Sequence, residues 1–194
     1  MYFFKPISDN VRFFQPIFSS YKYTMKLMLV AMFACFASIL QAAGGFLPGI
    51  GFFISPFATA PILLGAMLSL SFGGMAYLLT IMLLFILEPT ELIIFPFTTG
   101  LLGLGIGASF HFFRKRISVV AAGSVLLTLG IMSVLFILRF PILGPVSADS
   151  FSLLATASIL LFTFLYSWLW LEIALHIFNR IKGIMQGGLD NQDR

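Results

Sequence analysis

The chain has 194 residues, of which 60% are hydrophobic and only 9% are charged. An ordinary soluble domain has about 25% charged residues, and a domain of this size leaves too much of its chain at the surface to hide so many apolar side chains. The composition excludes a soluble globular protein and predicts an all-α, polytopic membrane protein. We interpret the net charge of +4 as a contact with anionic lipid at one membrane face, not with nucleic acid.

The basic residues predict the topology. Ten of the eleven Lys and Arg residues fall in three places separated by long apolar stretches. Because Lys and Arg concentrate in cytoplasmic loops, these places mark where the chain returns to one side, and we expect both termini in the cytoplasm. The three groups are Lys5, Arg12, Lys22 and Lys26, then Arg114, Lys115 and Arg116, then Arg180, Lys182 and Arg194, with Arg139 as the exception.

The first predicted crossing covers residues 26–43. Residues 1–25 mix aromatic and basic side chains, which is typical of a cytoplasmic segment lying on the lipid headgroups, and a disordered tail is the alternative. The charged region before the crossing is too long for a cleaved signal peptide. Residues 44–51 contain four glycines and a proline, which predicts a broken backbone and a loop folded back over the outer mouth of the bundle.

Five further crossings are expected, at about residues 56–71, 74–87, 92–113, 117–138 and 151–178. About 20 apolar residues cross the hydrocarbon core as a helix, so the stretch 56–88 is too long for one crossing, and we divide it at 71–74. A single crossing there would also put the Arg114 cluster on the wrong side. The prediction is therefore a six-helix transmembrane domain over 26–180 and a cytoplasmic tail over 181–194, in the cell membrane.

Small residues form stripes on two predicted helices. Ala31, Ala34 and Ser38 share one face of the first crossing, and Gly100, Gly103 and Gly107 share one face of the fourth. Small side chains let helices approach closely in lipid. The glycine stripe indicates packing within the bundle, with a groove for another protein as the alternative, whereas the first stripe is a candidate for docking a partner.

Polar side chains near the predicted outer face are candidates for binding a small molecule. A mostly apolar cavity with a few convergent polar groups is the usual form of such a site, and nearby aromatic rings could close over the ligand. The alternative is that the outer charges simply meet water. The candidates are Gln41, Phe46, Phe53, Thr59, Glu91 and Arg139, and Ser55, Thr98 and Thr99 are further neutral hydrogen-bonding groups near the same face.

Glu172 and His176 lie one helical turn apart near the cytoplasmic end of the sixth crossing. Such a pair could relay a proton or ligate a metal, but no second histidine lies nearby, and an interfacial ion pair or hydrogen bond is the simpler interpretation. We expect neither a metal nor a cofactor. Without a nucleotide-binding loop, a Ser/His/Asp arrangement or a cysteine cluster, the chain is not expected to be an enzyme.

The layout resembles the substrate-binding S components of energy-coupling factor (ECF) transporters. Residues 59–66 (TAPILLGA) are similar to the entry of that family's second helix, and Phe95 to Gly107 resembles its glycine-rich fourth segment. The resemblance implies uptake of a vitamin-like micronutrient, bound from outside beneath residues 44–58. It also implies a membrane coupling subunit and ATPases as partners, with the small-residue stripe of the first helix as the docking surface.

Two other functions stay open. The same layout is similar to the rod-shape protein MreD and to YybS-like membrane proteins, which implies a non-transporting scaffold of cell-envelope or sporulation assembly. The third possibility is a proton-coupled carrier that uses Glu172 and His176.

Overall fold

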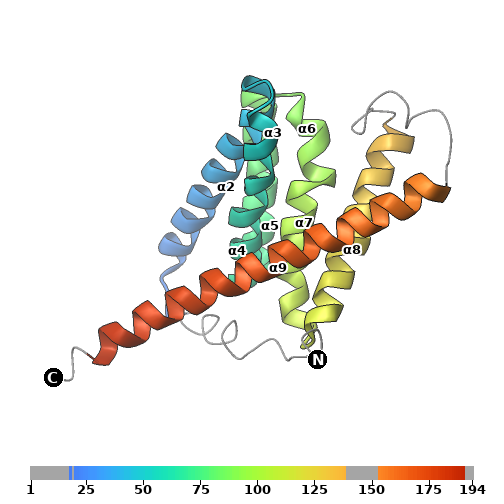
Figure 1. Ribbon diagram of the computed structural model, residues 1–194. Helices are drawn as coiled ribbons and strands as arrows, with labels where there is room; N and C mark the ends of the chain where they lie inside the picture. Colours follow the sequence, from blue (N-terminus) through green and yellow to red (C-terminus); the bar gives the residue numbers. More distant parts are fainter. Residues whose placement is uncertain (1–17, 19, 139–152, 191–194) are drawn as a thin grey trace.

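The computed structural model describes residue 18, residues 20–138 and residues 153–190. Figure 1 shows a bundle of helices, and no strand occurs in the described part of the chain. Six spans of helix are long and apolar enough to cross a membrane. The predicted all-α, six-helix architecture is therefore confirmed.

Helix α2 (Tyr23–Phe46) forms the first span and α5 (Leu70–Leu87) the third. The second span joins three short elements, α3 (Gly51–Ile54), η1 (Ser55–Ala58) and α4 (Thr59–Leu68). The fourth joins α6 (Glu91–Ile94), η2 (Phe95–Phe97) and α7 (Thr99–Phe112). The fifth is α8 (Arg116–Met132) with the π-helical turn η3 (Ser133–Ile137), and the sixth is α9 (Leu153–Asp190).

The two ends of the bundle differ in charge. We call the end at which α2 begins and α7 meets α8 the basic end, since Lys22, Lys26 and Arg114 to Arg116 flank these helix ends. It is the lower end in Figure 1. The opposite end, where α2 turns into α3 and α5 is followed by α6, carries Glu88 and Glu91, and we call it the acidic end.

Helices α4 and α7 form the centre of the bundle, because small residues let them pack closely. A Cβ added at Gly103 would lie 2.7 Å from the Thr59 carbonyl oxygen, and one at Gly107 would lie 2.8 Å from the Leu63 carbonyl oxygen. Neither backbone oxygen can move aside easily. The glycine stripe of the fourth span thus packs inside the chain, as its main interpretation predicted.

Two hydrophobic clusters meet at α4. One contains buried side chains from α4, α7, α8 and α9, including Leu63, Leu102 and Leu171. The other joins buried side chains of α2, α4 and α5, including Ala37, Ile62 and Leu84. Neighbouring residues of one helix thus face opposite halves of the bundle, which explains why α4 is buried along most of its length.

The glycine-rich stretch 44–51 does not form the predicted loop. Helix α2 continues through Gly44 and Gly45 to Phe46, and α3 begins at Gly51, so only residues 47–50 lie between helices. Gly49 takes the left-handed conformation, with φ of 79°, that the turn requires. The prediction overestimated how strongly glycine breaks a helix, because in lipid a glycine can be retained for close packing.

The break between the second and third spans is at Ser69, not at residues 71–74. Ser69 has an extended backbone, with φ of −160° and ψ of 131°, while the predicted breakers lie inside α5. Gly73 packs directly against Ala66 of α4. The glycine that suggested a turn therefore serves a helix–helix contact next to the real turn.

Helix α9 crosses the other helices obliquely (Figure 1). It has 38 residues, so its length is about 57 Å at 1.5 Å per residue, well beyond the roughly 30 Å of the hydrocarbon core. It continues through residues 181–190, which the sequence assigned to a tail. Hydroxyl groups attach it to α8: Thr163 Oγ1 lies 2.8 Å from Thr128 Oγ1 and 3.1 Å from Ser124 Oγ.

Most of the predicted interfacial segment 1–25 lies outside the described residues. Its described part includes Phe18, which is buried and contacts the Phe72 ring of α5 edge-on at 5.7 Å between centroids. The Lys26 ammonium lies 5.5 Å from the centroid of the same Phe18 ring. This is the arrangement of a cation–π contact and holds Phe18 at the basic end.

Candidate ligand site at the acidic end

Three polar side chains from the first and fourth spans meet at the acidic end. The Gln41 amide Nε2 of α2 donates a hydrogen bond of 2.7 Å to Glu91 Oε2 of α6. The Thr99 hydroxyl of α7 donates one of 2.7 Å to Gln41 Oε1. Gln41 is 1% exposed and Glu91 is 6% exposed. We call Gln41, Glu91 and Thr99 the polar cluster.

The last turn of α2 lies against the polar cluster. A Cβ added at Gly44 would be 2.5 Å from Glu91 Oε1 and 3.3 Å from the Ser55 Cβ, so the carboxylate and Ser55 both border this glycine. Gly44 is thus required for the carboxylate to reach its position. Next to it, Glu88 is more open, and its Oε1 accepts a hydrogen bond of 2.6 Å from the Thr90 hydroxyl.

In the described part of the chain, no Lys or Arg side chain pairs with the Glu91 carboxylate. The ion pair that is present there joins Arg116 to Glu172. The sequence has no Lys or Arg between Lys26 and Arg114. Glu91 is the first residue of α6, so the peptide dipoles of that helical end favour a negative charge. Burying an ionised carboxylate is nevertheless costly unless it is paired, and ionisable groups within spans are functional candidates for that reason.

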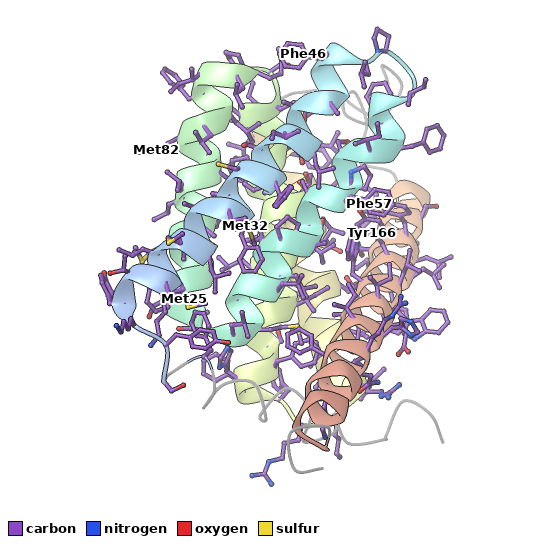
Figure 2. The ribbon with its side chains drawn as sticks, turned by 90° about the vertical axis from the view of Figure 1, so that its left-hand side faces the viewer. Met25, Met32, Phe46, Phe57, Met82 and Tyr166 are labelled. Carbon is purple, nitrogen blue, oxygen red and sulfur yellow. The ribbon has the colours of Figure 1, made fainter. Side chains whose placement is uncertain are left out.

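The other predicted ligand-binding residues do not join the polar cluster. Phe46 and Phe53 are 60% and 79% exposed, and Figure 2 shows Phe46 at the outer edge of the bundle. The two rings thus do not close over the polar cluster. Thr59 is fully buried, farther down the second span, and Arg139 lies outside the described residues.

Thr59 belongs to a contact between α4 and α9 instead. Tyr166 of α9 lies close enough for its hydroxyl to interact with Thr59 and Trp170, although neither Thr59 Oγ1 nor Trp170 Nε1 has a hydrogen bond of acceptable geometry. The Phe57 ring meets the Trp170 ring edge-on at 6.2 Å between centroids, and the Tyr166 ring meets the same Trp170 ring edge-on at 6.4 Å.

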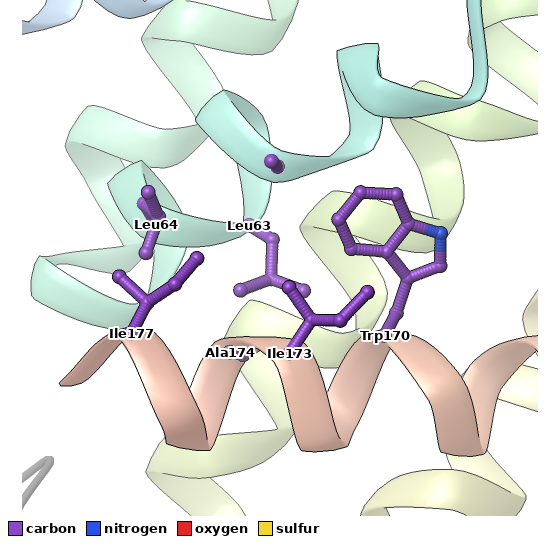
Figure 3. A pocket seen from close by; sticks show the side chains of 7 residues that line it. Leu63, Leu64, Trp170, Ile173, Ala174 and Ile177 are labelled. Carbon is purple, nitrogen blue, oxygen red and sulfur yellow. The ribbon is translucent and has the colours of Figure 1, made fainter. Parts of the chain in front are cut away.

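A shallow apolar groove, without room for an enclosed water molecule, runs beside this contact. Helix α4 provides one wall and α9 the other (Figure 3). The groove carries no ionisable side chain, so it is not the polar solute site that the sequence predicted. Its walls include Leu63 and Leu64 of α4 and Trp170, Ile173, Ala174 and Ile177 of α9.

The predicted docking stripe on α2 is mostly used inside the protein. Ala34 and Ser38 are 0% and 1% exposed, and Thr80 of α5 lies with its hydroxyl 3.5 Å from the Ala34 carbonyl oxygen. Ala31 is exposed. The assignment of Ala34 and Ser38 to a partner surface was wrong, because α5 covers the face that small residues made available for close approach.

Glu172 and His176 do not form the predicted pair. Glu172 Oε1 accepts a bond of 3.2 Å from Arg116 Nη1, whereas the His176 side chain is exposed. Glu172 thus takes part in an ion pair, as the simpler interpretation held, and its partner is Arg116, which begins α8 and reaches α9 across the basic end. At the same end, His111 Nε2 lies 2.7 Å from the Ala66 carbonyl oxygen.

Thr99 was predicted to lie near the outer face as one of the neutral hydrogen-bonding groups, and Arg116 was predicted only as part of a basic cluster, not as the partner of Glu172. Thr99 is the first residue of α7 and follows Pro96 by three residues. Because proline is tolerated at the start of a helix and not in its interior, Pro96 indicated that the long helix of the fourth span begins near Thr99. No group of three or more His, Cys, Asp or Glu side chains that could hold a metal ion occurs in the described part of the chain.

Comparison with protein-family models, curated proteins and solved structures found no match to this chain. Its class therefore depends on its own architecture. Six apolar spans around an apolar core, with a buried polar cluster near one end, are the features of a multi-pass α-helical membrane protein.

Proposed function

We propose that this chain is an integral membrane solute-binding subunit that takes up a small, vitamin-like micronutrient with the help of other proteins. The observation that carries the proposal is the polar cluster. Its three side chains come from two spans that are distant in the sequence, and polar groups held within spans are costly to keep without a use. The cluster supplies a carboxylate, an amide and a hydroxyl with which to recognise a polar solute.

The charge of the two ends supports an orientation for this uptake. We place the basic end in the cytoplasm, following the distribution of Lys and Arg in membrane proteins. The acidic end and the polar cluster then face outward in the cell membrane, and both termini are cytoplasmic. A solute would reach Gln41 and Glu91 from the side on which uptake begins.

The energy for uptake would come from partners, a membrane coupling subunit and ATPases, as in the ECF transporters that the layout resembles. The small-residue stripe of α2 is buried by α5 and leaves little for a partner to contact. A coupling subunit would instead meet the exposed apolar face of α2, which includes Met28, Met32, Phe36 and Ile39. The lipid bilayer is the alternative contact of that face.

Purification in mild detergent, followed by mass spectrometry of proteins and small molecules that remain bound, tests the proposal. We expect a coupling subunit with its ATPases, together with a solute that Glu91→Gln loses and Glu88→Gln retains. The second variant is a matched control, because Glu88 is three residues away and lies outside the polar cluster.

The second candidate function is a non-transporting scaffold of cell-envelope or sporulation assembly. One observation favours it: the groups of the polar cluster hydrogen-bond to one another and so already satisfy much of their bonding capacity. Envelope-assembly proteins in the purification, with no solute, would support the scaffold and overturn the transport proposal.

A further inference from the structure

We propose that the groove between α4 and α9 binds an anionic glycerophospholipid, with one acyl chain lying along the groove and the phosphate at Arg180. This goes beyond the proposed function, because it holds for a transporter and for a scaffold alike. The starting observation is a seam that is not fully closed, since α9 packs mainly against α8 and only lightly against α4. Four of the side chains that line this seam are only half-buried, namely Ala60, Leu64, Ile173 and Ile177.

The depth of the groove in the membrane determines what can cover it. Its α4 wall belongs to the second span, Gly51–Leu68, and its α9 wall to the sixth, Thr156–Arg180. The open side of the groove therefore faces the hydrocarbon core. The lining has no ionisable side chain, and its one polar group, Trp170 Nε1, is buried. Because the groove is shallow, an acyl chain fits it with one side still in the bilayer, whereas a polar solute finds no partner there.

Aromatic rings close the groove on the side of the acidic end. The Trp170 ring, which belongs to the lining, meets the Phe57 ring at 6.2 Å and the Tyr166 ring at 6.4 Å between centroids. Phe57 precedes α4, and Tyr166 precedes Trp170 by one turn of α9. An acyl chain in the groove therefore ends at these rings, and its headgroup is left on the side of the basic end.

Arg180 lies where that headgroup would be. Ile173, Ile177 and Arg180 follow one another at intervals of four and three residues, so they share one face of α9. Arg180 is about 4.5 Å beyond Ile177 along the helix, at 1.5 Å per residue. It is the last residue of the sixth span, and its side chain is exposed. A guanidinium at this level can donate two parallel hydrogen bonds to phosphate oxygens.

The charge of the basic end favours an anionic headgroup over a zwitterionic one. On α9 as far as Lys182, the one acidic residue is Glu172, and its carboxylate pairs with Arg116. Basic pockets between spans are the usual sites for the headgroups of anionic lipids. The basic side chains near the helix ends on this side are Lys22, Lys26, Arg114, Lys115, Arg116, Arg180 and Lys182.

Native mass spectrometry of the purified full chain tests the proposal, in detergent titrated with phosphatidylglycerol or with phosphatidylcholine of the same acyl chains. We expect phosphatidylglycerol to bind more tightly than phosphatidylcholine, and Arg180→Gln to weaken its binding by about fivefold. Arg114→Gln is the matched control, because Arg114 is exposed at the same end but lies between α7 and α8, outside the groove. Equal weakening by the two variants, or no preference for phosphatidylglycerol, would overturn the site at Arg180.

The place of the acyl chain is tested separately. Ala60→Phe puts a ring into the groove and must weaken phosphatidylglycerol binding, whereas Leu78→Phe, on an exposed apolar face of α5, must leave it unchanged. A measurement on the unmodified chain covers the case in which Ala60→Phe does not fold, as judged by gel filtration. Glycerol phosphate, which has the phosphate and no acyl chain, must fail to displace the bound lipid. Displacement by glycerol phosphate, or unchanged binding in folded Ala60→Phe, would overturn the proposal.

Discussion

The Gln41 amide donates to the Glu91 carboxylate across 2.7 Å, although 50 residues separate them in the sequence. This bond joins α2 to α6 at the acidic end, and Thr99 extends it to α7. We expect Gln41→Leu to lower the free energy of unfolding by about 1–3 kcal/mol or more, since a buried charged acceptor then loses its donor. Thermal unfolding in detergent measures the change.

The double variant Gln41→Leu/Glu91→Leu is the control for that prediction. Removing both partners leaves no buried charge, so the double variant is expected to be more stable than Gln41→Leu alone. If the stability losses of Gln41→Leu and Glu91→Leu simply add up to the loss of the double variant, the hydrogen bond does not couple α2 to α6.

Gly44 and Gly45 should respond differently to alanine. A Cβ at Gly44 meets the buried Glu91 carboxylate at 2.5 Å, whereas one at Gly45 meets the Glu88 side chain at 2.7 Å, and that side chain can swing toward water. We expect Gly44→Ala to destabilise by about 1–3 kcal/mol, as overpacking commonly does. Gly45→Ala should change stability little, and comparable losses in both variants would contradict the packing of Glu91 beneath Gly44.

The α4–α7 contact predicts a second glycine contrast. Gly107→Ala would place its Cβ 2.8 Å from a backbone oxygen of α4, so we expect a loss of about 1–3 kcal/mol. Gly74 of α5 has nothing within 4 Å of an added Cβ. Gly74→Ala should therefore stabilise, by the roughly 0.5–1 kcal/mol by which alanine exceeds glycine in helices. Melting temperatures of the two variants, measured side by side, check the opposite signs.

Thr59, predicted to bind the ligand, lies outside the polar cluster and gives a prediction about stability instead. The Thr59 hydroxyl is buried without a hydrogen bond of acceptable geometry, so Thr59→Val should be neutral or stabilising, by up to about 1–3 kcal/mol. A clear destabilisation would mean that the Tyr166 hydroxyl bonds to it.

At the basic end, His176→Gln should leave stability within about 0.5 kcal/mol, because the side chain is exposed. Glu172→Gln loses the ion pair with Arg116, and a partly exposed pair contributes about 0–1 kcal/mol. Chemical unfolding at low and high salt separates the two variants, since salt should reduce the Glu172 effect and not the His176 effect. Equal responses of the two variants to salt would mean that the ion pair between Glu172 and Arg116 does not contribute to stability.

The sequence predicted the number and order of the six spans because charge and hydropathy act over whole segments. Their ends were less accurate where glycine was involved. Gly44, Gly45 and Gly73 suggested loops, yet each lies inside a helix and permits a close contact with another helix. Gly44 and Gly45 contact Glu91 and Glu88, which are distant in the chain, and Gly73 contacts Ala66 across the turn at Ser69. Local helix propensity carries no information about such a partner.

The candidate site was predicted in part for the same reason. Gln41 and Glu91 stood out as polar groups in apolar surroundings, and the structure brings them together. Thr59 is also a polar residue in apolar surroundings, but it lies beside Tyr166 of α9 and not in the polar cluster. The buried stripe of Ala34 and Ser38 shows the same limit, because sequence spacing identifies a face of a helix and not what covers it.

The most direct test of the account is labelling of single cysteines with a membrane-impermeant maleimide in intact cells, in a chain whose Cys35 is replaced by alanine. Thr90 lies at the acidic end and Lys115 at the basic end, and both side chains are exposed. We predict that Thr90→Cys is labelled in intact cells and that Lys115→Cys is labelled only after permeabilisation. Labelling of Lys115→Cys alone in intact cells, or of both positions, would contradict the outward-facing polar cluster.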